Sequence, residues 1–128
     1  MDSAAATAAA TAATAATAAV DAAYNAAIKT FSAAKRLMRR SSARRRYILQ
    51  RIVAREQHLY DNASNKIKNK NHQAIYVKYV PERKKDNNLR ILRIKLRRAE
   101  AAEDVAWSAF CKADHALRIA NRRLGCIL

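Results

Sequence analysis

The chain of 128 residues contains one glycine, Gly125, and one proline, Pro81. Tight turns depend on these two residue types, and phosphate-cradling loops depend on several glycines, so the sequence argues against both a turn-rich β-fold and a glycine-loop nucleotide site. A chain with so few helix breakers is expected to form a few long helices. The sequence therefore predicts a mainly α protein with few long helices and at most one short strand or hairpin.

Aromatic residues and cysteines are also scarce. Phe, Trp and Tyr make up 6% of the chain, and much of its 51% hydrophobic content is alanine, which buries little surface, so we expect a thin core. The two cysteines, Cys111 and Cys126, are too few for a disulfide framework, which favours a reducing compartment. No run approaches 18 consecutive apolar residues, so we expect no membrane span.

The first twenty residues hold twelve alanines and four threonines. They lack the basic start and the leucine-rich centre of a secretory signal, so we expect an intracellular protein of the cytoplasm, nucleus, an organelle matrix or a virion, and not a secreted one. A plastid-type transit peptide is the alternative for this segment, although Asp2 and Asp21 count against it. A disordered alanine repeat is a second alternative; we favour a helix because alanine is the best helix former.

Two segments share a heptad pattern, with small or apolar residues at alternating spacings of three and four. The first runs through Thr17, Val20, Tyr24, Ala27, Phe31, Ala34 and Met38. The second runs through Leu89, Leu92, Leu96, Ala99, Glu103, Ala106, Phe110, Ala113, Leu117, Ala120 and Leu124, interrupted only by Glu103. Such seams are typical of coiled coils. We expect an Ala/Thr-rich neutral helix over 1–40 and a heptad-patterned helix over 88–128, packed antiparallel as a stalk that contacts a protein partner or a second copy.

The ends of the second helix carry their own signals. Asp86 or Asn87 is the expected N-cap, and Gly125 stands where a left-handed residue would end a helix. Between the two helices we expect a basic head over 41–87, with an asparagine-rich loop at 61–73. Within it, AIYVKYV (74–80) is the strand-like run before Pro81. Residues 89–96 could pair with that run as a hairpin, but the heptads downstream favour a helix.

Positive charge is concentrated in the middle of the chain. The whole chain carries 26 Lys and Arg against 10 Asp and Glu, a formal net charge of +16. Residues 35–98 hold 21 of those basic residues and only four of the acidic ones, whereas the two flanks are close to neutral. A charge excess confined to one segment indicates a contact surface for a polyanion. RNA is the preferred partner over DNA, and an anionic membrane surface ranks below nucleic acid.

The candidate nucleic-acid-binding side chains fall in this middle segment. The basic candidates are Arg39, Arg40, Arg44, Arg45, Arg46, Arg51, Arg55, Lys66, Lys68, Lys70, Arg83, Lys84, Lys85, Arg90, Arg93 and Arg97. Arginine suits phosphate because its planar guanidinium donates two parallel hydrogen bonds. Tyr47, Tyr76 and Tyr79 lie beside basic residues and are candidates for stacking on bases, although such tyrosines more often close the edge of a core.

Catalytic and metal-binding patterns are not found. Cys111 and His115 are four residues apart but lack a second pair of ligands, and no nucleophile stands with a base. We therefore expect no metal, no cofactor and no enzyme. The sequence favours a non-enzymatic RNA-binding structural component of a nucleoprotein assembly that contacts phosphates without strong sequence specificity. The alternative is a helical scaffold, such as a minor capsid component, whose basic residues face acidic protein surfaces.

Overall fold

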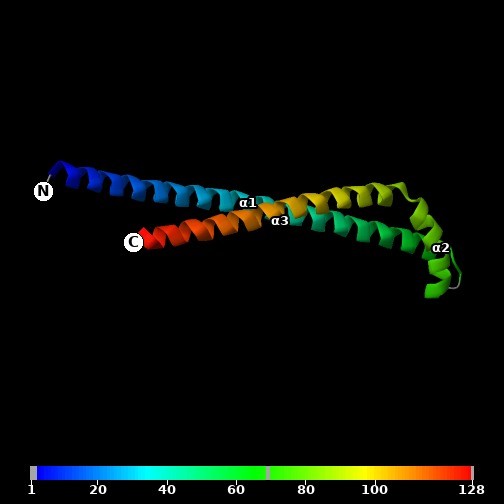
Figure 1. The fold of residues 1–128 in the computed structure, drawn as a ribbon. Helices are drawn as coiled ribbons and strands as arrows, with labels where there is room; N and C mark the ends of the chain where they lie inside the picture. Colours follow the sequence, from blue (N-terminus) through cyan, green and yellow to red (C-terminus); the bar gives the residue numbers. More distant parts are fainter. Residues whose placement is uncertain (1–2, 69, 128) are drawn as a thin grey trace. The chain divides into compact units, whose positions relative to one another are not determined.

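The computed structural model describes residues 3–68 and 70–127. Within these ranges the chain forms three helices and no strand: α1 (Ser3–Asn65), α2 (His72–Lys85) and α3 (Asn87–Ile127) (Figure 1). The mainly α prediction is confirmed. Residues 89–96 are helical, as the heptad pattern favoured.

The chain divides into two compact units. Unit 1 comprises residues 1–39 and 105–128, and unit 2 comprises residues 40–104. Within each unit, a segment of α1 and a segment of α3 lie side by side and run in opposite directions (Figure 1). The short helix α2 belongs to unit 2.

The heptad positions form the packed face of unit 1. Ala34 of α1 is buried, as are Ala106, Ala113 and Ala120 of α3. The rings of Phe31 and Phe110 meet with centroids 5.3 Å apart. Small alanines and larger apolar or aromatic side chains thus share one contact face, which is the arrangement that the spacing of three and four predicts.

The core of unit 2 draws on all three helices. Its buried members are Ile48, Ile52, Leu59, Ala63, Ile75, Tyr79, Leu89 and Ala99. Leu89, in the first turn of α3, is fully buried and is the largest side chain of which this is true among the described residues. Because the three helices pack together in this cluster, it determines which of their faces, and so which basic side chains, remain at the surface of unit 2.

The prediction of a strand at 74–80 is wrong, because these residues lie inside α2. Ile75 and Tyr79 are buried, whereas Val77 is exposed. A spacing of four places the first two on one helical face, whereas a strand would have placed all three on the same side. Burial of this face in the core outweighs the β-propensity of the run, and even Pro81 is accommodated within the helix.

The helix ends follow the capping rules only in part. The Asp86 carboxylate accepts a hydrogen bond from the Leu89 N–H at 2.9 Å, which confirms Asp86 as the N-cap of α3. The Asn71 side chain caps α2 by accepting from the Ala74 N–H at 2.7 Å. Gly125 lies within α3 without a positive φ, so the prediction that it ends the helix is wrong. The loop expected at 61–73 is shorter, because α1 continues to Asn65.

Candidate nucleic-acid interface

Unit 2 carries most of the positive charge. Residues 40–104 include 18 Lys and Arg against seven Asp and Glu, a net charge of +11 out of the total of +16. The position of each basic side chain on its helix decides whether that charge is neutralised within the protein or presented to solvent.

Two arginines occupy heptad positions of α1 that lie against α3. The Arg45 Nε donates to the Glu103 carboxylate at 3.0 Å. The Arg55 guanidinium donates two hydrogen bonds to Asp86, at 2.8 and 3.1 Å. Arg45 lies seven residues after Met38, and Arg55 lies seven after Ile48, so both continue the seam beyond the residues that the sequence pattern identified. Glu103, the one interruption of the α3 seam, is the partner that Arg45 requires.

These contacts lower the pKa of both carboxylates. Hydrogen bonding from Arg55 lowers the pKa of Asp86 below its usual range; burial opposes this, and the Leu89 N–H adds to it. Hydrogen bonding from Arg45, and then from Ser42, lowers the pKa of Glu103. The Asp86 hydrogen bond in turn raises the pKa of Arg55. Both carboxylates are therefore charged at neutral pH, and the two pairs stabilise the contact between α1 and α3 in unit 2.

Ion pairs also attach α2 to α1 and to the turn that follows α1. Glu56 accepts a hydrogen bond from the Tyr79 hydroxyl at 3.3 Å and lies 3.6 Å from the Arg83 guanidinium. Lys66 pairs with Glu82 at 3.3 Å. Burial raises the pKa of Tyr79, and the negative charge of Glu56 raises it further, so this hydroxyl stays protonated as a donor. Four of the sixteen basic candidates, Arg45, Arg55, Lys66 and Arg83, thus hold the fold together.

The other twelve candidates have no carboxylate within ion-pair distance in the described part of the chain. They are Arg39, Arg40, Arg44, Arg46, Arg51, Lys68, Lys70, Lys84, Lys85, Arg90, Arg93 and Arg97. Arg39 belongs to unit 1 and the other eleven to unit 2. All are exposed except Arg93, which is half-buried.

One basic hollow lies between α1 and α3 of unit 2. This α1–α3 groove has a volume of about 490 Å³ and is lined by Arg51, Ala54, Arg55, His58, Asn88, Ile91, Leu92 and Lys95. His58 and Lys95 were not among the residues that the sequence singled out. The heptad register could have identified them. Arg51 and His58 each stand one residue before a seam residue of α1, and Asn88 and Lys95 each stand one residue before a seam residue of α3. Such flanking positions face each other in an antiparallel pair.

A second basic hollow lies where α2 meets α3. This elbow cleft has a volume of about 240 Å³ and is lined by Arg83, Lys84, Asp86, Arg90, Arg93, Ile94 and Arg97. The sequence pattern had placed five of these residues in the candidate set, but not together in one cavity. Arg90, Arg93 and Arg97 share a face of α3 because they are three and four residues apart.

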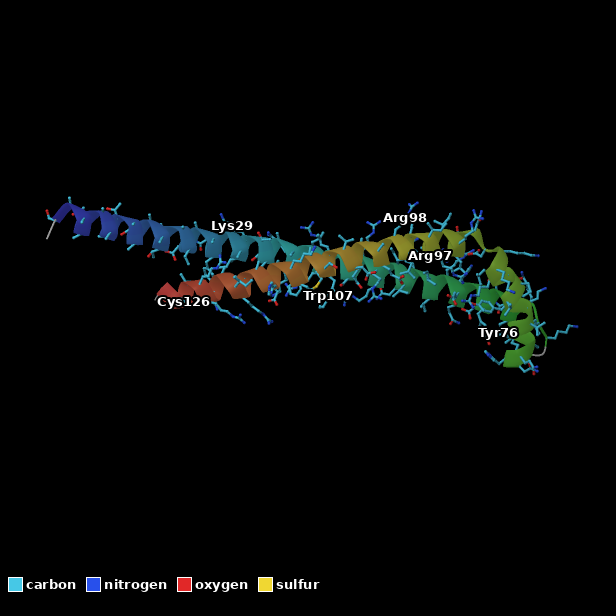
Figure 2. The ribbon with its side chains drawn as sticks, in the orientation of Figure 1. Lys29, Tyr76, Arg97, Arg98, Trp107 and Cys126 are labelled. Atoms are coloured by element: carbon cyan, nitrogen blue, oxygen red, sulfur yellow. The ribbon has the colours of Figure 1, made fainter. Side chains whose placement is uncertain are left out.

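The three candidate tyrosines differ in exposure. Tyr47 is 57% exposed, and the Arg51 guanidinium lies 5.8 Å from its ring centroid. Tyr76, labelled on α2 in Figure 2, is 45% exposed and lies 5.6 Å from the His72 ring. Tyr79 is only 5% exposed and packs in the core. A ring that is covered on its faces cannot receive a base, so only Tyr47 and Tyr76 are available for stacking.

Features outside unit 2 add little to the site. Among the described residues, no three His, Cys, Asp or Glu side chains are grouped to hold a metal ion. A window near the start of α1 is long and apolar enough to cross a membrane, although core helices and signal sequences meet the same criterion. Comparisons with models of protein families, with curated proteins and with solved structures find no match.

Proposed function

We propose that this chain is a non-enzymatic nucleic-acid-binding protein that contacts phosphates with little base specificity, as a structural component of a nucleoprotein assembly. RNA is the favoured ligand, because Tyr47 and Tyr76 present exposed rings beside basic side chains. The proposed interface consists of the eleven unpaired basic candidates of unit 2. The four paired candidates and Tyr79 serve the fold instead.

The observation that supports this proposal is that some basic residues of unit 2 pair with carboxylates whereas others do not. Glu56, Glu82, Asp86 and Glu103 each engage a basic residue within unit 2. Eleven further basic candidates have no such partner in the described part of the chain, and two hollows gather several of them. Unneutralised like charges repel one another, so a surface of this kind gains stability when it binds a polyanion.

The test is the salt dependence of RNA binding by the full chain, followed by fluorescence anisotropy of a labelled single-stranded RNA. If about six phosphates are contacted, the slope of log affinity against log salt is about −4, because each contact on a single strand contributes about −0.7. Arg44→Gln combined with Arg51→Gln should make the slope shallower by about 1.4 and weaken binding about 25-fold at 0.1 M salt.

The matched control removes the same charge from unit 1. Arg36 and Arg122 are exposed, and neither forms an ion pair within the described residues. Arg36→Gln combined with Arg122→Gln should leave the slope unchanged. A flat salt response of the unsubstituted protein would contradict the proposed function.

A scaffold role, with basic residues against an acidic protein surface, is the second candidate, and an exposed apolar side chain in unit 1 favours contact with a protein. Trp107, labelled on α3 in Figure 2, is 55% exposed. Its ring stacks on that of Phe110 with centroids 5.8 Å apart. Exposed tryptophans are frequent anchors of protein interfaces. Heparin displaces a partner held through a phosphate-binding surface, whereas failure of heparin to displace the natural partner would favour this scaffold role.

A further inference from the structure

We infer that the elbow cleft is a discrete seat for one phosphate group, distinct from the diffuse basic surface around it. The inference rests on the proposed function for the source of its ligand, which is either an internal phosphodiester or the terminal phosphate of a nucleic acid. The cleft places five cationic side chains, Arg83, Lys84, Arg90, Arg93 and Arg97, around one cavity. Its volume of about 240 Å³ is below the usual range of pockets for larger organic ligands, about 300–1,000 Å³, and suits a small anion.

The one carboxylate in the cleft does not neutralise these cations. Asp86 has a side chain only 11% exposed, and its oxygens accept two hydrogen bonds from Arg55 and one from the Leu89 N–H. Arg55 does not line the cleft, so the Asp86 charge is balanced from outside it. The lining thus holds four cations without a carboxylate partner among the described residues, Lys84, Arg90, Arg93 and Arg97, whereas Arg83 pairs with Glu56 and Asp86 pairs with Arg55.

Arg83, one of the residues that line the cleft, also carries an unsatisfied donor. The Nε of Arg83 is buried without a hydrogen-bond partner, the one such side-chain nitrogen or oxygen found among the described residues. The Nη2 of the same guanidinium lies 3.6 Å from Glu56, so the group is held on one side and lacks an acceptor at Nε. Buried donors are normally satisfied, and a phosphate oxygen would supply the missing acceptor once the guanidinium turned its Nε toward the cleft.

Arg97 and Arg98 provide a matched pair for the test. The two are consecutive on α3 and both are exposed, but only Arg97 lines the cleft, and Figure 2 labels both. The first experiment titrates sodium phosphate into the full chain at constant ionic strength, with chloride as the reference anion. NMR signals of the arginine Nε–H groups report the site directly.

We expect phosphate to shift the Nε–H signals of Arg83, Arg90, Arg93 and Arg97 while those of Arg44 and Arg98 stay in place. Arg97→Gln should weaken phosphate binding about 5-fold or more, whereas Arg98→Gln should leave it unchanged. Equal shifts at all exposed arginines, or none at any, would overturn the inference.

The second experiment identifies the source of the phosphate with RNA carrying a 5′-phosphate or a 5′-hydroxyl. Tighter binding of the 5′-phosphorylated RNA, lost in Arg97→Gln, supports a terminal phosphate. Equal binding of both RNAs, weakened equally by Arg97→Gln, supports an internal phosphodiester. Salt-dependent RNA binding that Arg97→Gln leaves unaltered overturns the seat while the proposed function stands. Phosphate shifts in the cleft without RNA binding support the seat while the proposed function fails.

Discussion

Replacement of Leu89 by alanine tests whether the core of unit 2 is organised as described. Leu89 is fully buried at the start of α3, where the core cluster brings all three helices together. Ile91, two residues later on the same helix, is 48% exposed. Leu89→Ala and Ile91→Ala each remove three carbon atoms at positions two residues apart, so they differ mainly in burial.

The expected cost of Leu89→Ala follows from that burial. Three buried methylene equivalents at about 0.8 kcal/mol each correspond to about 2.4 kcal/mol of lost transfer free energy. The cavity that remains raises the loss in the free energy of unfolding to about 3–4 kcal/mol. Ile91→Ala loses about half of the transfer term and regains a few tenths from the higher helix propensity of alanine, so its net cost is about 1 kcal/mol or less.

Urea denaturation followed by circular dichroism at 222 nm measures both variants. With a slope of about 2 kcal/mol per molar urea, Leu89→Ala should lower the midpoint by about 1.5–2 M and Ile91→Ala by about 0.5 M or less. Equal shifts for the two variants would refute the packing of α3 in unit 2. Because the elbow cleft begins beside Leu89, such a result would also remove the basis for placing its arginines together.

Two further predictions concern the elbow between α2 and α3. The lowered pKa of Asp86 means that its pairing stabilises the fold above the ordinary value of 3.8 and that this contribution is lost as the pH falls through the lower folded value. Asp86→Asn should therefore reduce stability at pH 7 and make the urea midpoint less sensitive to acidification, whereas an unchanged pH profile would contradict the ion pair. Pro81→Ala should raise the free energy of unfolding by about 1–3 kcal/mol, since proline within a helix lacks an N–H donor; an unchanged urea midpoint would contradict a continuous α2.

The sequence was sufficient to predict the helices that obey a heptad repeat. Each predicted seam residue of α3, from Leu89 to Leu124, is buried or half-buried, because alternating spacings of three and four place these residues on one face of that helix. The heptad pattern could not predict that the residues of α2 form a helix. The run at 74–80 is rich in β-branched and aromatic residues, and only contact with α1 and α3 shows that Ile75 and Tyr79 share a helical face.

The candidate site was predictable as a set of residues but not as an arrangement. The concentration of Lys and Arg between 35 and 98 identified the basic segment, but it could not show which residues line the two hollows. Arg55 lies 31 residues from Asp86, and Arg45 lies 58 residues from Glu103, so these pairs depend on the register between helices distant in sequence. Lys95 was overlooked for the same reason, because its place opposite Arg51 follows from the antiparallel register and not from its neighbours in sequence.

Position on the helix, more than residue type, decides the role of each arginine in unit 2. Arg44 and Arg45 are adjacent and chemically identical, yet Arg45 stands on the seam and pairs with Glu103, whereas Arg44 is exposed beside it. Arg51 and Arg55 repeat the contrast about two to three turns later, with Asp86 as the partner of Arg55. A seam arginine exchanges water for a carboxylate on folding, and its removal leaves that carboxylate unpaired. An arginine outside the seam remains solvated, and its removal changes the free energy of unfolding little. Loss of charge at Arg45 or Arg55 is thus expressed as reduced stability, and loss of charge at Arg44 or Arg51 as weaker binding of a polyanion by a fold that remains intact.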